Sequence, residues 1–162
     1  MKQFLCVAII LALLVAPGCS KNEPNGTPFY YCVANASYTP GSTVIDKEYR
    51  DNIPADSLMD TLEHYLQGPT SSNLVSPFPE GMTVVSANQD GDALYLTVSM
   101  ELTALKGLDL TLACGCLTLT CLEITDAQQV HISSIYGLLD GQRTIIMDKN
   151  TLLLLDNSQV GE

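Results

Sequence analysis

The chain has 162 residues, with 18 acidic and 7 basic side chains and a formal net charge of −11. This balance argues against nucleic acid as a partner, because nucleic-acid-binding proteins gather Lys and Arg against phosphates. It argues equally against non-specific adhesion to anionic lipid. The length suffices for one compact domain and hardly for two.

The first residues have the pattern of an export signal. Lys2 precedes an apolar run over residues 4–15, which is short for a membrane span and right for a signal peptide. The following "VAPGC" resembles the bacterial lipobox, with Gly18 before Cys19 and Ala16 where that motif usually has Leu. The resemblance implies cleavage after Gly18 and lipidation of Cys19 by acyl chains such as palmitate. An ordinary secretory signal and an uncleaved membrane helix are the alternatives.

Two acyl chains hold a protein stably at a membrane where one does not. We therefore expect a lipoprotein signal peptide at residues 1–18 and a lipid-anchored chain on the extracytoplasmic face of the cell membrane. Residues 19–28 are polar, contain Pro and Gly, and predict a flexible tether. The folded domain is expected at residues 29–156.

The next elements in chain order are two strands and a helix. Residues 28–34 are aromatic and β-prone, and residues 43–49 predict a short second strand. A helix of about eleven residues follows, in which Ser57 and Asp60 fit a capping box. Its end is marked by Gly68, which can take the left-handed conformation, and by Pro69. Its apolar face consists of Leu58, Met59, Leu62, Tyr65 and Leu66.

The second half of the chain predicts mainly strands. Residues 83–99 form an expected hairpin around Asp90 and Gly91. Residues 107–125 are ambiguous, since alternating leucines favour a strand whereas a Leu–Cys–Leu stripe favours a helix, and local propensity leans towards strand. Residues 127–134 predict another strand. Residues 135–155 predict short strands, divided by turns at Asp140-Gly141 and Lys149-Asn150.

The stretch that follows the first predicted helix carries a family pattern. "LQGP", then "LVSPFPEGMTVVSANQDGDALYLTVS", resembles the GerMN domain of bacterial sporulation and spore-germination lipoproteins, over about residues 29–134. A second helix after the hairpin is usual in that family, which favours a helix over residues 108–123. The family's Pro-Gly step is missing from "TCLEITDAQQV", and the chain beyond Ser134 departs from the pattern. The matching residues are Leu66, Gly68, Pro69, Pro77, Pro79, Gly81 and the strand pair around Asp90-Gly91.

Together, the elements and the resemblance predict an α+β fold. We expect a single small domain with a mixed sheet of about four to five strands and two helices packed on one face. The prolines and glycines between residues 66 and 81 would fix how the first helix lies on the sheet. The same stiff segment could instead form a contact surface, and both interpretations remain open.

The sequence offers no recognisable catalytic centre and no cofactor site. His64 and His131 stand apart from any pattern of nucleophile and base, and no Gly-rich phosphate loop occurs. The cysteines of the predicted domain allow buried free thiols, one disulfide, or a metal site, for which the spacing is a poor match to zinc. These cysteines are Cys32, Cys114, Cys116 and Cys121.

The resemblance implies a non-catalytic envelope protein whose domain binds other envelope proteins or itself, in sporulation or spore germination. No small-molecule substrate is expected. One alternative is a ligand-binding or sensing domain for a cell-wall fragment, although the absence of Trp disfavours stacking against sugars. A second alternative is an enzyme or thiol-redox protein.

Overall fold

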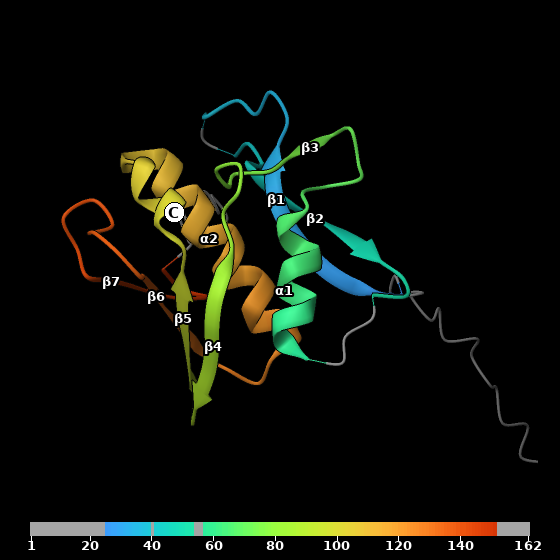
Figure 1. The fold of residues 1–162 in the computed structure, drawn as a ribbon. Coiled ribbons are helices and arrows are strands. Elements are labelled where there is room, and N and C mark those ends of the chain that lie inside the picture. The colour runs from blue at the N-terminus through green and yellow to red at the C-terminus, as the bar shows by residue number, and fades with distance from the viewer. Residues whose placement is uncertain (1–24, 40, 54–56, 152–162) are drawn as a thin grey trace, which may run out of the picture.

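The computed structural model in Figure 1 describes residues 25–39, 41–53 and 57–151. The predicted signal peptide, Cys19 and most of the predicted tether lie outside the described residues, as does the run of leucines after Thr151. The described chain has an α+β fold with two α-helices, one short 3-10 helix and two sheets. The elements are β1 (Thr27–Val33), β2 (Ile45–Arg50), α1 (Leu58–Leu66), β3 (Leu74–Val75), β4 (Val84–Asp90), β5 (Ala93–Val98), η1 (Met100–Ala104), α2 (Gly107–Ile124), β6 (Gln129–Ser134) and β7 (Thr144–Asp148).

The first sheet is antiparallel and has the strand order β2-β1-β3. Cys32 of β1 lies opposite Ile45 of β2 on one side and Val75 of β3 on the other. The two strands predicted at residues 28–34 and 43–49 are therefore present, and β1 begins at Thr27, within the last residues of the predicted tether. The separate sheet was not predicted, because β3 has only two residues and its sequence carries no strand signal of its own.

The second sheet is mixed and has the order β4-β5-β6-β7. β4 and β5 form the predicted hairpin, in which Asp90 lies opposite Ala93 and Gly91 has a φ of 57°. β5 and β6 run parallel, joined by a crossover through α2, and β7 returns antiparallel to β6. Along β5 the inward side chains of Leu94, Leu96 and Val98 are buried, which confirms the predicted alternation.

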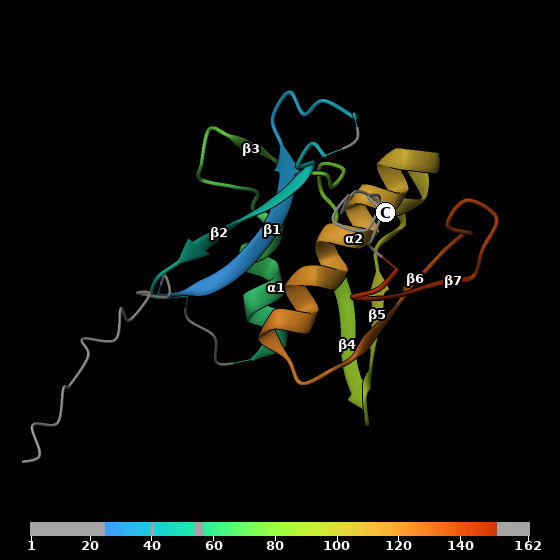
Figure 2. The same cartoon turned by 180° about the vertical axis from the view of Figure 1, so that it is seen from behind.

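Helix α2 fills the space between the two sheets. It packs against β1 on one side and against β6 and β7 on the other, and the two views in Figures 1 and 2 both show it there. Side chains are buried around most of its circumference, so it has almost no polar face. The strand favoured by local propensity over this stretch is wrong, and the helix implied by the family resemblance is confirmed.

In the part of the chain that the structure describes, α2 is also the one helix long and apolar enough to cross a membrane. Its burial between two sheets instead makes it the core helix of the domain. A helix that is buried around most of its circumference needs no amphipathic period, which is why its sequence could be mistaken for a strand. The hydroxyls of Thr111 and of the C-cap residue Thr125 donate hydrogen bonds to backbone carbonyls of the helix four residues earlier, so these polar side chains are satisfied locally.

Helix α1 has the predicted boundaries at its capping residues, with nine residues rather than eleven. The Ser57 side chain accepts a hydrogen bond from the Asp60 N–H at 3.2 Å and donates to the Asp60 carboxylate at 2.8 Å. Leu62 and Tyr65 are fully buried and join α1 to the same core as α2 and β5. Both helices thus pack on the inner side of the four-stranded sheet.

Candidate functional site

The segment with the family pattern, residues 66–81, is held at both ends by the fold. Gly68 ends α1 with a φ of 88° and donates its N–H to the Tyr65 carbonyl at 3.2 Å. Gly81 turns into β4 with a φ of 78°. Between them, β3 pairs with β1, and Phe78 packs edge-on against Tyr65 at 5.2 Å between ring centroids. This segment is part of a sheet and of the core rather than a free loop.

Arg50 of β2 fastens the end of α1 to the three-stranded sheet. Its guanidinium donates to the His64 carbonyl at 3.1 Å, to the Gly68 carbonyl and to the Tyr31 hydroxyl at 3.0 Å. The Tyr31 hydroxyl in turn donates to the Tyr65 carbonyl at 2.7 Å. A cation at this position also complements the negative end of the helix dipole.

Glu48, two residues before Arg50 on the same face of β2, completes the cluster. It accepts from Arg50 at 2.6 and 2.7 Å, and from the backbone N–H groups of Thr70 and Ser71 at 3.0 to 3.1 Å. Burial opposes the charge, but the Thr70 N–H, Arg50 and the Ser71 N–H outweigh it and hold the pKa of Glu48 below its usual value. The ionised carboxylate therefore fixes the turn directly after Pro69.

This Arg50–Glu48 cluster directs its charges inward. The two side chains are only 13% and 10% exposed, so little of either is left for a partner. The sequence analysis missed both residues, although the alternation in "EYR" places them on one face of a strand. Their contacts favour the architectural interpretation of the motif that includes Gly68 and Pro69.

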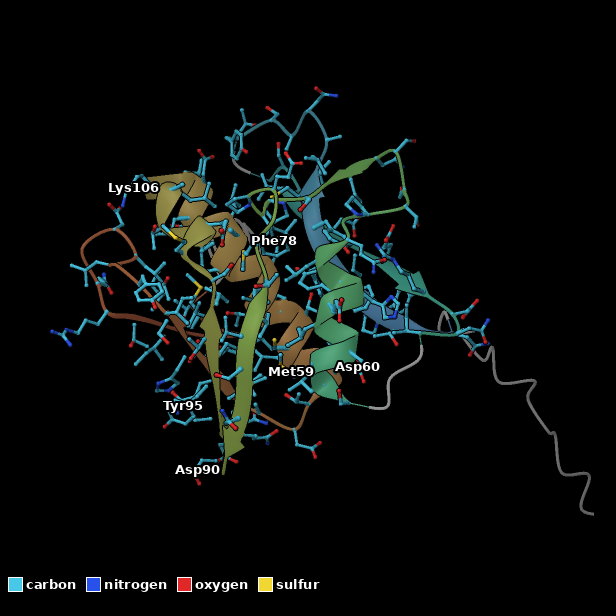
Figure 3. The ribbon with its side chains drawn as sticks, viewed as in Figure 1. Met59, Asp60, Phe78, Asp90, Tyr95 and Lys106 are labelled. Carbon is cyan, nitrogen blue, oxygen red and sulfur yellow. The ribbon has the colours of Figure 1, made fainter. Side chains whose placement is uncertain are left out.

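Two of the motif residues, Leu66 and Gly81, line an open groove between α1 and β4. Its volume is about 440 Å³, and Met59 stands beside β4 in Figure 3. The groove is also lined by Glu63, Gln67, Met82, Thr83 and Val84. Pro77 belongs instead to a second groove, beside Cys32 and Tyr38, so the structure does not gather the motif residues at one surface.

A group of exposed apolar residues lies elsewhere, at the end of the domain where η1 meets the β6–β7 loop. The chain after β6 runs alongside η1: the Ile135 N–H donates to the Val98 carbonyl at 2.9 Å, and Gly137 approaches the Thr103 side chain. The Gly107 N–H then donates to the Asp140 carboxylate at 3.2 Å. We call this surface the apolar end and define it by its exposed residues Met100, Leu108, Ile135, Tyr136 and Leu138.

The apolar end has a charged border of both signs, since Asp140 and Glu101 lie there together with two basic residues. Lys106 precedes α2 at this end of the molecule (Figure 3), and Arg143 lies beside Gly137 and Leu138. Leu139, directly after the exposed Leu138, is fully buried and anchors the loop to the core. The sequence analysis treated this stretch only as a source of short strands. The signal it contained was a set of large apolar residues next to glycines, in a segment too irregular to form a strand.

The outer face of the four-stranded sheet is a further uncovered surface. Tyr95, His131 and Ile146 lie side by side across β5, β6 and β7, and the Tyr95 and His131 rings are 4.6 Å apart. Figure 3 shows Tyr95 directed away from the helices. His131 thus faces away from Val130 and Ile132, as the alternation predicted.

All four cysteines in the described residues are free thiols, of which Cys114, Cys116 and Cys121 are buried and Cys32 is half-buried. Burial raises the pKa of Cys114 to about 12 and raises that of Cys121 as well. Among residues 25–39, 41–53 and 57–151, no three His, Cys, Asp or Glu side chains come together as a set that could hold a metal ion. The sequence left open free thiols, a disulfide or a metal site, and in the structure these four cysteines are free thiols.

Comparison with protein families identifies the domain. Residues 28–137, which contain both sheets except β7, match the Germane family, described as sporulation and spore germination. The chain belongs to this family. The GerMN resemblance predicted from residues 66–98 is therefore confirmed and extends slightly beyond Ser134, although the Pro-Gly step is missing.

The GerMN domain also resembles a solved structure, a 2.5 Å crystal structure of a candidate lipoprotein from Clostridium perfringens. The two share 14% sequence identity, with a TM-score of 0.47, over 76% of this chain and 87% of the other. The chain matches no curated protein.

Proposed function

We propose that this GerMN protein is a non-catalytic lipoprotein of the extracytoplasmic face of the cell membrane, acting in sporulation or spore germination. Its domain binds another envelope protein, or a second copy of itself, through the apolar end. The observation that carries this proposal is the gathering of exposed apolar side chains from two segments of the chain at one end.

The apolar end has the composition of a protein interface. Tyr136, at 70% exposed, and Met100, at 56% exposed, are residue types that protein interfaces concentrate at their centres. Lys106 and Arg143 supply a charged border, as interface rims commonly do. Exposed large apolar side chains from two segments in contact are typical of a contact surface when they form one patch.

The anchor and the apolar end would lie on opposite sides of the domain. β1 begins at Thr27 and the apolar end lies across the molecule from that point in both views (Figures 1 and 2). If Cys19 carries the lipid, the eight-residue step to Thr27 spans at most about 28 Å. The domain would then stay close to the membrane while directing the apolar end away from it.

The anchor is tested by mass spectrometry of the mature protein from membranes. We expect an N-terminal peptide that begins at Cys19 with added acyl mass, and its loss in Cys19→Ser. A mature chain that is unmodified and recovered from the culture medium would contradict the anchor.

The interface is tested with a photo-crosslinking residue placed at Tyr136 in sporulating cells. A matched control carries the same residue at Asp90, which lies at the tip of the β4–β5 hairpin (Figure 3). We expect a discrete adduct from position 136 and none from position 90; an adduct of twice the chain's mass would identify a second copy as the partner. The same diffuse set of lipoproteins from both positions would contradict the proposal.

A further inference from the structure

We propose that Cys32 and Cys116 form a redox-active dithiol, which a low-molecular-weight disulfide oxidises to an intramolecular disulfide linking β1 to α2. This goes beyond the proposed function and does not depend on which protein the apolar end binds.

The packing of β1 against α2 is fixed by Tyr30. Its N–H donates to the Thr120 hydroxyl at 3.0 Å, and its hydroxyl donates to Glu123 at 2.8 Å. Alternation along β1 directs Cys32 to the same side as Tyr30, whereas Phe29 and Tyr31 face the ring of Tyr65.

Cys32 lies two residues after Tyr30, or about 6.7 Å further along the strand. Cys116 lies four residues before Thr120, or about 6.0 Å back along α2. The two elements run in opposite directions, because Tyr30 shares a groove with Leu119, Leu122 and Glu123, and Cys32 shares one with Asp109 and Leu112. A step forward along β1 and a step back along α2 therefore lead the same way in space, and because the two steps are of similar length, Cys32 and Cys116 lie opposite each other.

The two thiols perturb each other as close neighbours do. A hydrogen bond with the Cys116 thiol is the main cause of a lowered pKa at Cys32, and the same contact together with burial raises the pKa of Cys116. The thiolate is the attacking species in thiol–disulfide exchange. Cys32 is thus the attacking thiol of the pair, with Cys116 available to resolve the product.

Solvent access to the two sulfur atoms also distinguishes the attacking thiol, Cys32, from the resolving thiol, Cys116. Cys32 lines an open groove of about 380 Å³ beside Tyr38, Val75 and Pro77, so a small disulfide reagent can reach its sulfur. Cys116 is fully buried, as are Cys114 and Cys121. Of the four thiols in the described residues, Cys32 is therefore the one open to a reagent in the folded protein.

The reaction balances as two exchanges. The Cys32 thiolate attacks one sulfur of the external disulfide, forms a mixed disulfide and releases the first thiolate. Cys116 then loses its proton and attacks the Cys32 sulfur, which expels the second thiolate, and that thiolate takes up the proton. The protein loses two electrons and the external disulfide is reduced to two thiols. Outside the cytosol such a bond would persist, a condition that rests on the proposed location.

The experiment uses oxidised glutathione on the full chain with Cys114 and Cys121 replaced by Ala. In this variant the tryptic peptide of residues 107–143 contains Cys116 as its single cysteine, and Cys32 lies in the peptide of residues 22–47. After reaction without denaturant, remaining thiols are alkylated and the peptides are analysed by mass spectrometry. We expect the two peptides joined by a disulfide, with no glutathione left on either.

Two further variants separate the steps. Adding Cys116→Ala should leave glutathione on Cys32 as a stable mixed disulfide. Adding Cys32→Ala should leave Cys116 in the 107–143 peptide unmodified in the folded protein. Because a core substitution can unfold the chain, circular dichroism accompanies each variant, and the joined peptides are also sought in the otherwise unaltered chain. Persistent glutathione on Cys32 while Cys116 is present, a disulfide between two chains, or no reaction before denaturation would each overturn the proposal.

Failure of this proposal is distinguishable from failure of the proposed function. The peptide analysis needs neither a membrane nor a partner, whereas the crosslink at position 136 needs no cysteine. If the protein crosslinks at position 136 but forms no disulfide, the proposed function stands and the dithiol proposal is wrong. If it forms the disulfide but does not crosslink, the dithiol proposal stands and the proposed interface is wrong.

Discussion

The Arg50–Glu48 cluster and the apolar end use their side chains in opposite ways. Around Arg50, two charged side chains are drawn into the protein and bonded to carbonyls, N–H groups and a tyrosine hydroxyl. At the apolar end, large apolar side chains stand in solvent. The first region lies at the family motif and the second at segments without a motif. The residues of the family motif therefore serve the fold, and they lie apart from the surface proposed for a partner.

Removing the cation should have the largest effect on stability. Arg50→Ala leaves Glu48 charged and mostly buried without its partner, so we expect a loss of about 3–5 kcal/mol in the free energy of unfolding. The matched control is Lys47→Ala on the same strand, which breaks a more exposed pair with Glu123 at 3.6 Å and should cost less than about 1 kcal/mol. Urea denaturation measures both, and equal losses would remove the contrast between buried and exposed pairs.

The carboxylate of the same cluster should give a pH-dependent effect of intermediate size. The pKa of Glu48 is lower in the folded protein than its usual 4.5, so the unfolded chain binds the proton more readily. The stabilisation is present above the unfolded-state pKa and is lost as pH falls through the folded-state pKa.

Glu48→Gln should cost about 1.5–3 kcal/mol at pH 7, the usual range for hydrogen bonds to a charged group. It should also flatten the decline of stability below pH 4.5, because the titrating carboxylate is gone. Urea midpoints measured between neutral and acidic pH give both quantities. An unchanged slope in the variant would show that other carboxylates control acid unfolding.

The end of α1 should give a smaller effect through its backbone. Gly68→Ala forces a side chain into the left-handed region, which costs about 1–2 kcal/mol. A Cβ at this position would meet Ser76 at an ordinary 3.8 Å, so the cost is conformational rather than a clash. Gly68→Asn is the matched variant, since Asn tolerates this conformation and should recover part of the loss. Thermal unfolding of the two variants decides the point.

The apolar end should show the smallest effect on stability. Tyr136→Ser removes a side chain that is already 70% exposed, so the free energy of unfolding should change by less than about 0.5 kcal/mol. Recovery of the partner by a crosslinker at Met100 should fall sharply in the same variant. Strong destabilisation by Tyr136→Ser would instead show that this surface is part of the core.

Sequence reasoning succeeded where a local rule fixes the structure. Ser57 and Gly68 bound α1 through capping and a left-handed residue, and Asp90-Gly91 makes a turn that the flanking alternation supports. These features depend on a few neighbouring residues. For the same reason, the inward face of β5 was predicted correctly from alternation.

It failed where distant parts of the chain decide. The helical state of α2 follows from burial between two sheets, which no window of its own sequence contains. Its sequence supported both a strand and a helix, and the family resemblance decided in favour of the helix. β3 exists because β1 offers an edge, and Arg50 acquires its role only when α1 folds back onto β2. The apolar end likewise needs two segments more than 30 residues apart, joined by the contact of Gly107 with Asp140.

The hydrogen bond from Tyr30 to Thr120 joins positions 90 residues apart. β1 can pair with β2 and β3 and contact α1 earlier, but the side of the strand that faces α2 stays uncovered until this helix is made, and contacts that distant form slowly. A chain threaded through a membrane from its amino end would keep most of its apolar surface uncovered until nearly the whole domain had emerged. If the chain is exported as proposed, the same dependence would keep the part still awaiting translocation unfolded, because the core cannot close before α2 has been synthesised.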